Sequence, residues 1–292
     1  MGWKRATDRE PACRLVRFEA TDGVGLAGVL YEPNGGRASA RPPVIIWLHG
    51  TGGASVFESR RTNLLAAEFL ARGIAFFPFN NRGAHVVRRA GDGLGGAAFE
   101  RIRDCVFDID GVVRELRRRG YRDLFLAGHS TGANKVAVYD RLEPRNRIKR
   151  YILLAGGDDT ALLHDARLLS KARAMIRARR GHELMWSPLR ELMSWRAYYD
   201  VANPRGDYNV FGPPWRQIKR IRKPSLYIYG DRDEYEPDIP ALAKQVGPNA
   251  EIVVLEDTDH GFTGREGELG QLIADWLTIT EAVPTRTRRR GE

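Results

Sequence analysis

A short apolar stretch that ends at a serine between two glycines constrains the fold of this chain more than any other feature. Residues 124–132 read Leu-Phe-Leu-Ala-Gly-His-Ser-Thr-Gly, and residues 133–139 have the composition of a helix. A buried strand that turns into a helix at a serine is the context in which Gly-x-Ser-x-Gly carries meaning, whereas alone the pattern could be an ordinary turn. Gly128 and Gly132 allow a turn so sharp that a Cβ atom at either position would collide. The free N–H groups of the helix would face Ser130, which makes its hydroxyl a candidate nucleophile.

Apolar segments alternate with helical patterns along most of the chain. The predicted buried strands, besides the one before Ser130, are residues 44–48, 74–79, 151–155, 225–229 and 252–255. Helical periodicity marks residues 60–72, 99–116 and 269–277. This alternation predicts a parallel sheet covered by helices on both faces. A hairpin of residues 14–20 and 26–31 adds an antiparallel edge, so we expect about eight strands.

The alternation fails between residues 156 and 222, which are helical and rich in Arg, Met and aromatic residues. Since loops in such sheets are normally ~2–6 residues long, we interpret this stretch as an inserted helical cap. The expected organisation is a first core part at 1–155, the cap at 156–222, a second core part at 223–283 and a disordered basic tail at 284–292.

Composition favours a globular protein. The chain has 292 residues, of which 42% are hydrophobic, enough to bury a core. Its two cysteines, Cys13 and Cys105, are too few for a disulfide framework or a zinc site. We find no signal-peptide pattern and no apolar run near the ~20 residues that span a bilayer. We therefore expect a cytoplasmic location and no membrane partner.

The formal charge of +10 would fit nucleic-acid binding, but the arginines are spread along the chain in clusters without interleaved aromatic residues. These clusters are residues 117–119, 177–180 and 286–290. We interpret them as solvated surface and expect no nucleic-acid partner. Salt-sensitive retention on DNA would indicate the opposite.

Reactive side chains follow four of the predicted strands. These are Ser130, residues 49–53 (His-Gly-Thr-Gly-Gly), residues 230–233 (Gly-Asp-Arg-Asp) and residues 259–262 (Asp-His-Gly-Phe). Ligands collect at the carboxyl ends of the strands in open α/β sheets, so these segments can meet in space. A serine, an acid and a histidine in that chain order supply a nucleophile, an orienting acid and a base.

Taken together, these motifs resemble the α/β-hydrolase superfamily, and the resemblance covers nearly the whole chain. It implies the α/β-hydrolase fold, with a mostly parallel eight-stranded sheet, helices on both faces and an inserted helical cap. The motifs that carry it are His49-Gly50, Gly128-His-Ser-Thr-Gly132, Gly230-x-x-Asp233 and Asp259-His260-Gly261.

The resemblance also implies which residues form a catalytic triad with Ser130. In this family the acid is usually the last residue of a Gly-x-x-Asp turn, which here is Asp233, with Asp231 and Glu234 as alternatives. The base is expected at His260. No metal or organic cofactor is required.

Two backbone N–H groups would complete an oxyanion hole in such an enzyme. By resemblance they belong to Thr131, directly after the nucleophile, and to Thr51 or Gly52 in the loop after an earlier strand. Glycines in that loop let it pass close to a substrate carbonyl. His49 and His129 are expected to support turns.

The expected function is therefore a serine esterase that hydrolyses a small-molecule ester, with amides and thioesters less favoured. Short stretches, among them residues 79–83 (Phe-Asn-Asn-Arg-Gly), resemble a branch of the superfamily that includes fungal siderophore esterases. A serine aminopeptidase-like peptidase and a non-catalytic small-molecule-binding protein remain as alternatives. The oligomeric state and the substrate stay open.

Three further patterns have simpler readings. Gly91-x-Gly93-x-x-Gly96 matches a dinucleotide fingerprint by letters, but no strand directly precedes it, and we expect a loop. Aromatic and Met residues of the cap could line an acyl pocket, although packing is favoured for most of them: Met185, Trp186, Trp195, Tyr198, Tyr199 and Trp215. Cap arginines that could attract an anion are Arg173, Arg177 and Arg179.

Overall fold

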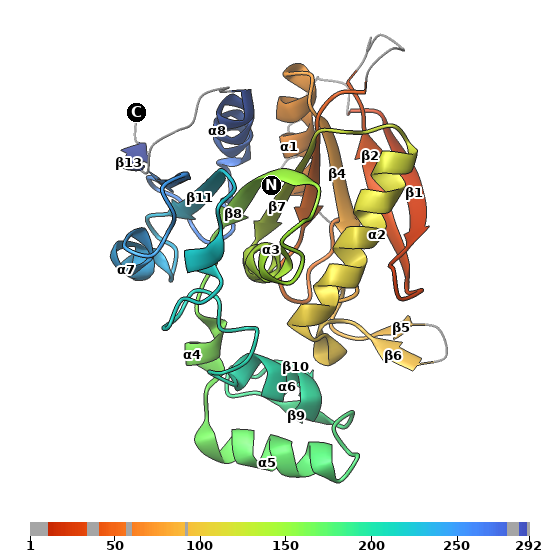
Figure 1. Ribbon diagram of the computed structural model, residues 1–292, viewed down its shortest axis with the longest axis vertical. Coiled ribbons are helices and arrows are strands. Elements are labelled where there is room, and N and C mark those ends of the chain that lie inside the picture. Colours follow the sequence, from red (N-terminus) through yellow and green to blue (C-terminus); the bar gives the residue numbers. More distant parts are fainter. Residues whose placement is uncertain (1–10, 34–40, 57–59, 91–92, 279–285, 291–292) are drawn as a thin grey trace, which may run out of the picture.

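The computed structural model describes residues 11–33, 41–56, 60–90, 93–278 and 286–290. A twisted central sheet crosses the described part of the chain (Figure 1). In spatial order its strands are β1 (Cys13–Glu19), β2 (Gly25–Tyr31), β4 (Ala75–Asn80), β3 (Val44–Leu48), β7 (Leu124–His129), β8 (Ile148–Leu154), β11 (Ser225–Gly230), β12 (Ala250–Leu255) and β13 (Arg286–Arg290). β2 is antiparallel to both of its neighbours, β1 and β4, and the other neighbouring strands of this sheet pair in parallel. The predicted α/β-hydrolase fold, with its antiparallel edge, is confirmed.

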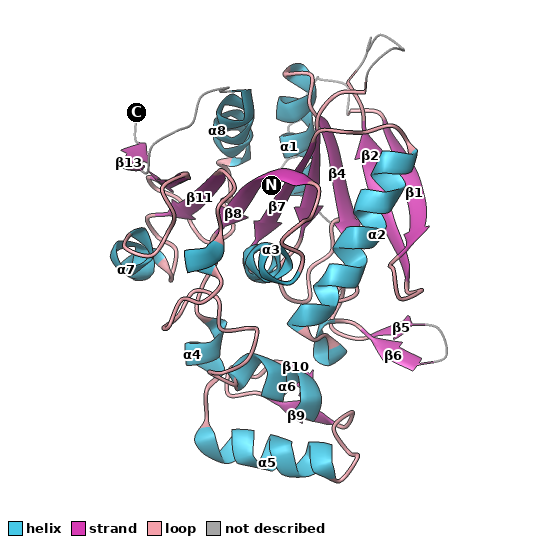
Figure 2. Cartoon of the chain, viewed as in Figure 1, coloured by secondary structure: helices cyan, strands magenta, loops and turns pink. Residues whose placement is uncertain are grey.

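Helices cover both faces of this sheet (Figure 2). One face carries α1 (Arg60–Ala71) and α8 (Glu266–Thr278), and the other carries α2 (Cys105–Arg118), α3 (Thr131–Leu142) and α7 (Ile239–Ala243). Each face has its own buried hydrophobic cluster, which is why all five residues of β3 are buried. Short 3-10 helices occupy Ala97–Phe99, Ile102–Asp104, Ile218–Arg220 and Glu236–Asp238. No helix in the described ranges is long and apolar enough to cross a membrane.

The stretch 159–202 lies beyond one end of the sheet (Figure 1), whereas residues 210–221 contribute to the buried cluster on one face of the sheet. Its elements are α4 (Asp159–Leu163), α5 (Ala166–Arg177), β9 (Leu184–Trp186), β10 (Leu192–Ser194) and α6 (Trp195–Ala202). A separate hydrophobic cluster holds these elements together. We keep the name cap for residues 156–222, and the predicted division of the chain into a core and an inserted cap stays a prediction.

Two segments differ from the sequence-based expectations. We expected residues 284–292 to be disordered, but Arg286–Arg290 form β13, which pairs in parallel with β12. Without it, β12 would be an edge strand with unpaired backbone groups, and such an edge accepts an added strand. The rest of this tail is outside the described residues. The glycine-rich segment expected as a loop includes a short hairpin of β5 (Arg88–Ala90) and β6 (Gly93–Gly95), with residues 91–92 not described.

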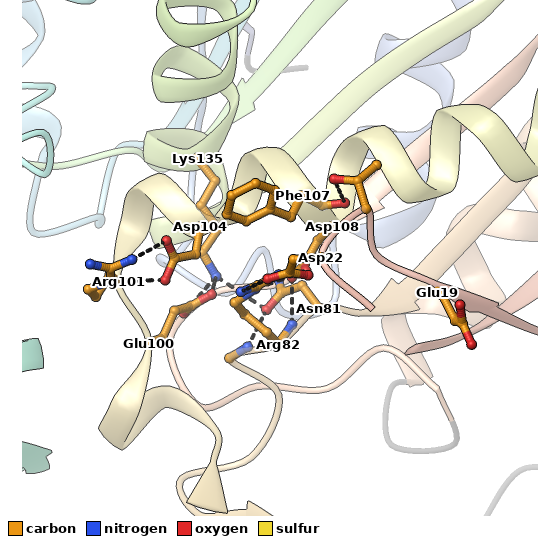
Figure 3. A network of polar contacts seen from close by, with 12 residues as sticks. Glu19, Asp22, Asn81, Arg82, Glu100, Arg101, Asp104, Phe107, Asp108 and Lys135 are labelled. Atoms are coloured by element: carbon orange, nitrogen blue, oxygen red, sulfur yellow. Dashed lines mark hydrogen bonds and ion pairs between the residues drawn. The ribbon is translucent and has the colours of Figure 1, made fainter. Parts of the chain in front are cut away.

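A buried network of charged and polar groups supports the end of β4 (Figure 3). Lys135 on α3 is 1% exposed, and its Nζ lies 2.8 Å from Oε1 of Glu100 and 3.3 Å from Oδ1 of Asn81. Arg82 donates hydrogen bonds to Asp108, which is fully buried, and to Asp22. These contacts hold the end of β4 against α2 and α3.

This network also explains the sequence Asn80-Asn81-Arg82. Asn80 Oδ1 accepts hydrogen bonds from the N–H groups of Ser55 and Val56, at 2.7 and 3.0 Å. The three side chains therefore fix the loops around them, and their presence has a structural reason that does not depend on any substrate.

Breaking the Lys135–Glu100 pair should destabilise the fold. In Lys135→Met the carboxylate of Glu100 would stay buried without its partner, which typically costs about 3–5 kcal/mol. We expect the free energy of unfolding in urea to fall by about that amount, and a Lys135→Met/Glu100→Gln double variant to recover part of it. Arg180→Ala, which removes an exposed ion pair with Glu183, is the control and should leave the midpoint unchanged. An unchanged midpoint of urea unfolding in Lys135→Met would show that the Lys135–Glu100 pair does not stabilise the fold.

Candidate functional site

Ser130 occupies a strained turn between β7 and α3. Its backbone has φ 57° and ψ −128°, a left-handed conformation that a side-chain-bearing residue rarely adopts. A Cβ atom at Gly128 would lie 2.1 Å from the carbonyl oxygen of Gly132, and one at Gly132 would lie 2.5 Å from that of Leu48. Both glycines are therefore required, as the sequence predicts. The N–H of Ser130 donates to the carbonyl of Leu154 at 2.8 Å, which fixes the turn to β8.

The loop after β3 lies directly against Ser130. In the sheet, Leu48 is the register partner of Gly128, so the two strands end side by side. A Cβ atom at Gly50 would lie 2.9 Å from Cβ of Ser130, a contact that only glycine avoids. The hydroxyls of Thr51 and Thr131 are 2.6 Å apart and join the loop to the start of α3. The two predicted oxyanion donors thus lie on neighbouring segments beside Ser130.

The side chain of His49 fixes the same loop through hydrogen bonds of both ring nitrogens. The N–H of Asn81 donates to Nε2 of His49 at 3.2 Å, so Nδ1 must carry the ring proton and donate to the carbonyl of Gly50 at 2.8 Å. Burial and the nearby charge of Lys135 lower the pKa of His49 to about 3. His49 is therefore a neutral structural histidine, as its sequence context indicates.

His260 is hydrogen-bonded to Asp233. Its Nδ1 lies 3.1 Å from Oδ1 of Asp233, whose side chain is fully buried at the carboxyl end of β11. Asp231, the first alternative acid, instead accepts the N–H of Thr258, and Glu234 lies at the cavity wall. Of the three carboxylates, Asp233 is the one that the structure brings onto the imidazole.

The surroundings of His260 set its protonation. Burial is the largest single influence and would lower the pKa of His260. The hydrogen bond and charge of Asp233, with smaller contributions from Glu234 and Asp159, outweigh burial and raise the pKa above its ordinary value. A carboxylate at Nδ1 leaves Nε2 as the ring atom that can accept a proton.

His129, the residue before Ser130, connects the nucleophile turn to the loop of His260. Arg61 NH1 donates to Nδ1 of His129 at 3.2 Å, so the proton is on Nε2, which donates to the carbonyl of His260 at 2.8 Å. The two imidazole rings are 5.1 Å apart. Burial and the charge of Arg61 lower the pKa of His129 to about 3. This side chain therefore joins two loops, which is more than the turn support expected from sequence.

Ser130 and His260 line the same cavity, whose volume is about 590 Å³. The core contributes Arg61 and the loop after β3 to its wall. The cap contributes Leu162, Leu189, Glu191, Met193, Val201 and Tyr208. Tyr235 donates to Oδ1 of Asp159 at 2.8 Å. Burial, with the charge of Glu191 adding to it, raises the pKa of Asp159 to about 6.

Sequence reasoning missed Arg61, Asp159, Tyr208 and Tyr235 as cavity residues. Asp159 comes shortly after β8, so the strand-end rule could have identified it. No sequence pattern could have identified Arg61, because it lies on a helix and reaches the cavity only through the packing of α1.

The aromatic and Met residues of the cap that the sequence suggested for an acyl pocket do not line the cavity. Met185, Trp195 and Tyr198 belong to the hydrophobic cluster of the cap, as the favoured packing reading predicts. Trp215 packs in the core, and Trp186 is 66% exposed. The cap arginines expected to attract an anion also do not line this cavity among the described residues.

The described residues include no group of three His, Cys, Asp or Glu side chains placed to hold a metal ion.

A family model described as the alpha/beta hydrolase family matches residues 45–269. The chain therefore belongs to the α/β-hydrolase family, and this membership supports a hydrolase. A search of curated proteins finds no match.

Solved structures with the same fold include several esterases. Est1E from Butyrivibrio proteoclasticus, bound to ferulic acid, is 20% identical with a TM-score of 0.65, over 90% of this chain and 98% of that chain. The α/β hydrolase GrgF from Penicillium sp. sh18 is 16% identical with a TM-score of 0.69, over 91% and 98%. The Pyrococcus furiosus esterase Pf2001 is 18% identical with a TM-score of 0.58, over 91% and 92%. At these identities the likeness shows the fold alone.

Removing the hydrogen bond from His129 should loosen the position of His260. His129→Phe keeps a ring but deletes the N–H that holds the carbonyl of His260. We expect the rate constant for labelling of Ser130 by a fluorophosphonate to fall roughly ten- to a hundredfold, because a displacement of about 1 Å costs on this order. His164→Phe is the matched control, since it removes a similar hydrogen bond to the carbonyl of Ala202. Equal rate constants of labelling for His129→Phe and wild type would contradict a role of His129 in positioning His260.

Proposed function

We propose that this protein is a serine hydrolase that cleaves carboxylic esters through a Ser130–His260–Asp233 triad. The observation that carries the proposal is the position of Ser130 and His260 on one cavity, with His260 bonded to the buried carboxylate of Asp233. Family membership and the esterases among the structural neighbours support the reaction class.

The reaction would begin when the hydroxyl of Ser130 attacks the ester carbonyl. Nε2 of His260 takes the hydroxyl proton and then passes it to the departing alcohol. Asp233 stabilises the imidazolium and keeps the proton of Nδ1 in place. Water, deprotonated by the same Nε2, then attacks the acyl-enzyme and releases the acid and free Ser130.

The N–H groups of Thr51 and Thr131 would stabilise the negative charge on the carbonyl oxygen. Thr131 begins α3, so its N–H has no partner within the helix. The contact of Gly50 with Ser130 keeps the loop of Thr51 next to the reacting carbon. Losing one such donor typically costs about 3 kcal/mol of transition-state stabilisation.

Covalent labelling tests the nucleophile directly. We expect a fluorophosphonate to label the wild-type protein at a single site, identified as Ser130 by peptide mass spectrometry, and to leave Ser130→Ala unlabelled. The labelled protein should lose hydrolysis of short nitrophenyl esters. A matched set of ester, thioester, amide and aminoacyl substrates then separates the esterase from a peptidase. An unlabelled wild-type protein would favour a binding protein on the same scaffold.

The acid is tested by pH dependence. In the wild type, kcat/KM should fall as the pH drops through the raised pKa of His260, because protonated imidazole cannot act as base. Asp233→Asn removes the main influences that raise this pKa, so burial then dominates and the acid limb should move to lower pH. The same change should lower kcat by about 10⁴. Asp231→Asn is the control and should keep the wild-type profile. If Asp231→Asn moves the limb and Asp233→Asn does not, the acid is misassigned.

A further inference from the structure

Arg61 is a cavity residue whose guanidinium has few partners. It lies at the start of α1, is half-buried and lines the cavity that holds Ser130 and His260. A guanidinium has five N–H donors. Within the described residues, the bond from NH1 to His129 is the only hydrogen bond of this side chain.

No carboxylate in the described part of the chain forms an ion pair with Arg61. The nearest acidic influences, Glu266 and Asp259, act on it only through their charge, while burial lowers its pKa. Arg72, directly after the same helix, shows the contrast, because it pairs with Glu68 at 3.2 Å and with Asp275 at 3.0 Å. A partly desolvated cation without a counter-ion is costly to keep unless something pairs with it.

Arg61 also lies close to the reacting groups. Its NH1 holds His129, the neighbour of Ser130 in the chain, and its NH2 would lie 3.6 Å from a Cβ atom at Gly261, the neighbour of His260. The described residues also place three carboxyl groups on the cavity wall, Glu234 on the core and Asp159 and Glu191 on the cap. Burial raises the pKa of both carboxyl groups on the cap, to about 6 for Asp159, so each takes up a proton more readily than an exposed carboxylate would when an anion binds nearby.

We propose that Arg61 is the anion-binding subsite of this cavity and that the substrate is an ester that carries a carboxylate. This inference rests on the proposed function and narrows its substrate class. The carboxylate would accept two N–H groups of Arg61 while the ester carbonyl lies at Ser130. A charge-assisted pair of this kind typically changes affinity by tenfold or more.

Two pairs of esters test the subsite, one with the charge on the acyl side and one with it on the alcohol side. They are mono-(4-nitrophenyl) adipate against 4-nitrophenyl 6-methylheptanoate, and 4-acetoxybenzoate against 4-acetoxybenzamide. For at least one pair we expect wild type to have a kcat/KM about tenfold or more higher for the anionic member. Arg61→Gln should bring the ratio of that pair close to one, Arg61→Lys should keep part of it, and Arg72→Gln should match wild type.

Binding to Ser130→Ala protein gives a readout that does not need turnover. Calorimetry with the same four esters should show the same preference for one anionic ester, and Ser130→Ala/Arg61→Gln should lose it. Equal or weaker binding of both anionic esters overturns the subsite, as does a preference that survives Arg61→Gln. If Ser130→Ala keeps the preference for the anion while wild type hydrolyses no ester, the subsite stands and the proposed hydrolysis fails.

Discussion

The reversal of the backbone at Ser130 is the constraint on which the rest of the site depends. A side-chain-bearing residue with φ 57° is strained, typically by about 1–3 kcal/mol, and such a turn persists only when its surroundings fix it. Here β8 holds the N–H of Ser130, and the backbone of α3 passes so close to β3 that Gly132 admits no side chain. The strain is therefore maintained by the sheet, and it presents the hydroxyl at the carboxyl end of the central strand.

Three histidines near this turn show how environment separates identical side chains. His49 and His129 are held neutral by burial and by nearby cations, and each uses its one ring proton to fix a backbone carbonyl. His260 has a buried carboxylate at Nδ1, and its pKa is raised instead. The first two set the positions of the loop after β3 and of the loop of His260. Only the third has the electrostatic surroundings of a base.

The charge of the cavity does not follow the charge of the chain. The sequence carries a formal +10, yet among the described residues the cavity wall combines one guanidinium, Arg61, with the carboxylates of Asp159, Glu191 and Glu234. The many arginines elsewhere contribute ion pairs and surface charge, as with Arg180 and Glu183. Selectivity in such a site depends on the few charges that lose water there, because screening weakens the rest.

By itself the sequence determined the fold class, the turn at Ser130 and the need for Gly128 and Gly132, because strand and helix periodicity and glycine sterics are local properties. The resemblance of its motifs to a known family also narrowed the acid to three carboxylates, but only the packing of β11 against the loop of His260 brought Asp233 within hydrogen-bonding distance of the imidazole. Local sequence patterns could not predict which side chains line the cavity. Arg61 faces it because α1 packs beside the loop of His260, whereas Met185, Trp195 and Tyr198 face away because they pack in the hydrophobic cluster of the cap. Which side chains face a cavity depends on contacts between segments far apart in the chain, and these exist only in the folded protein.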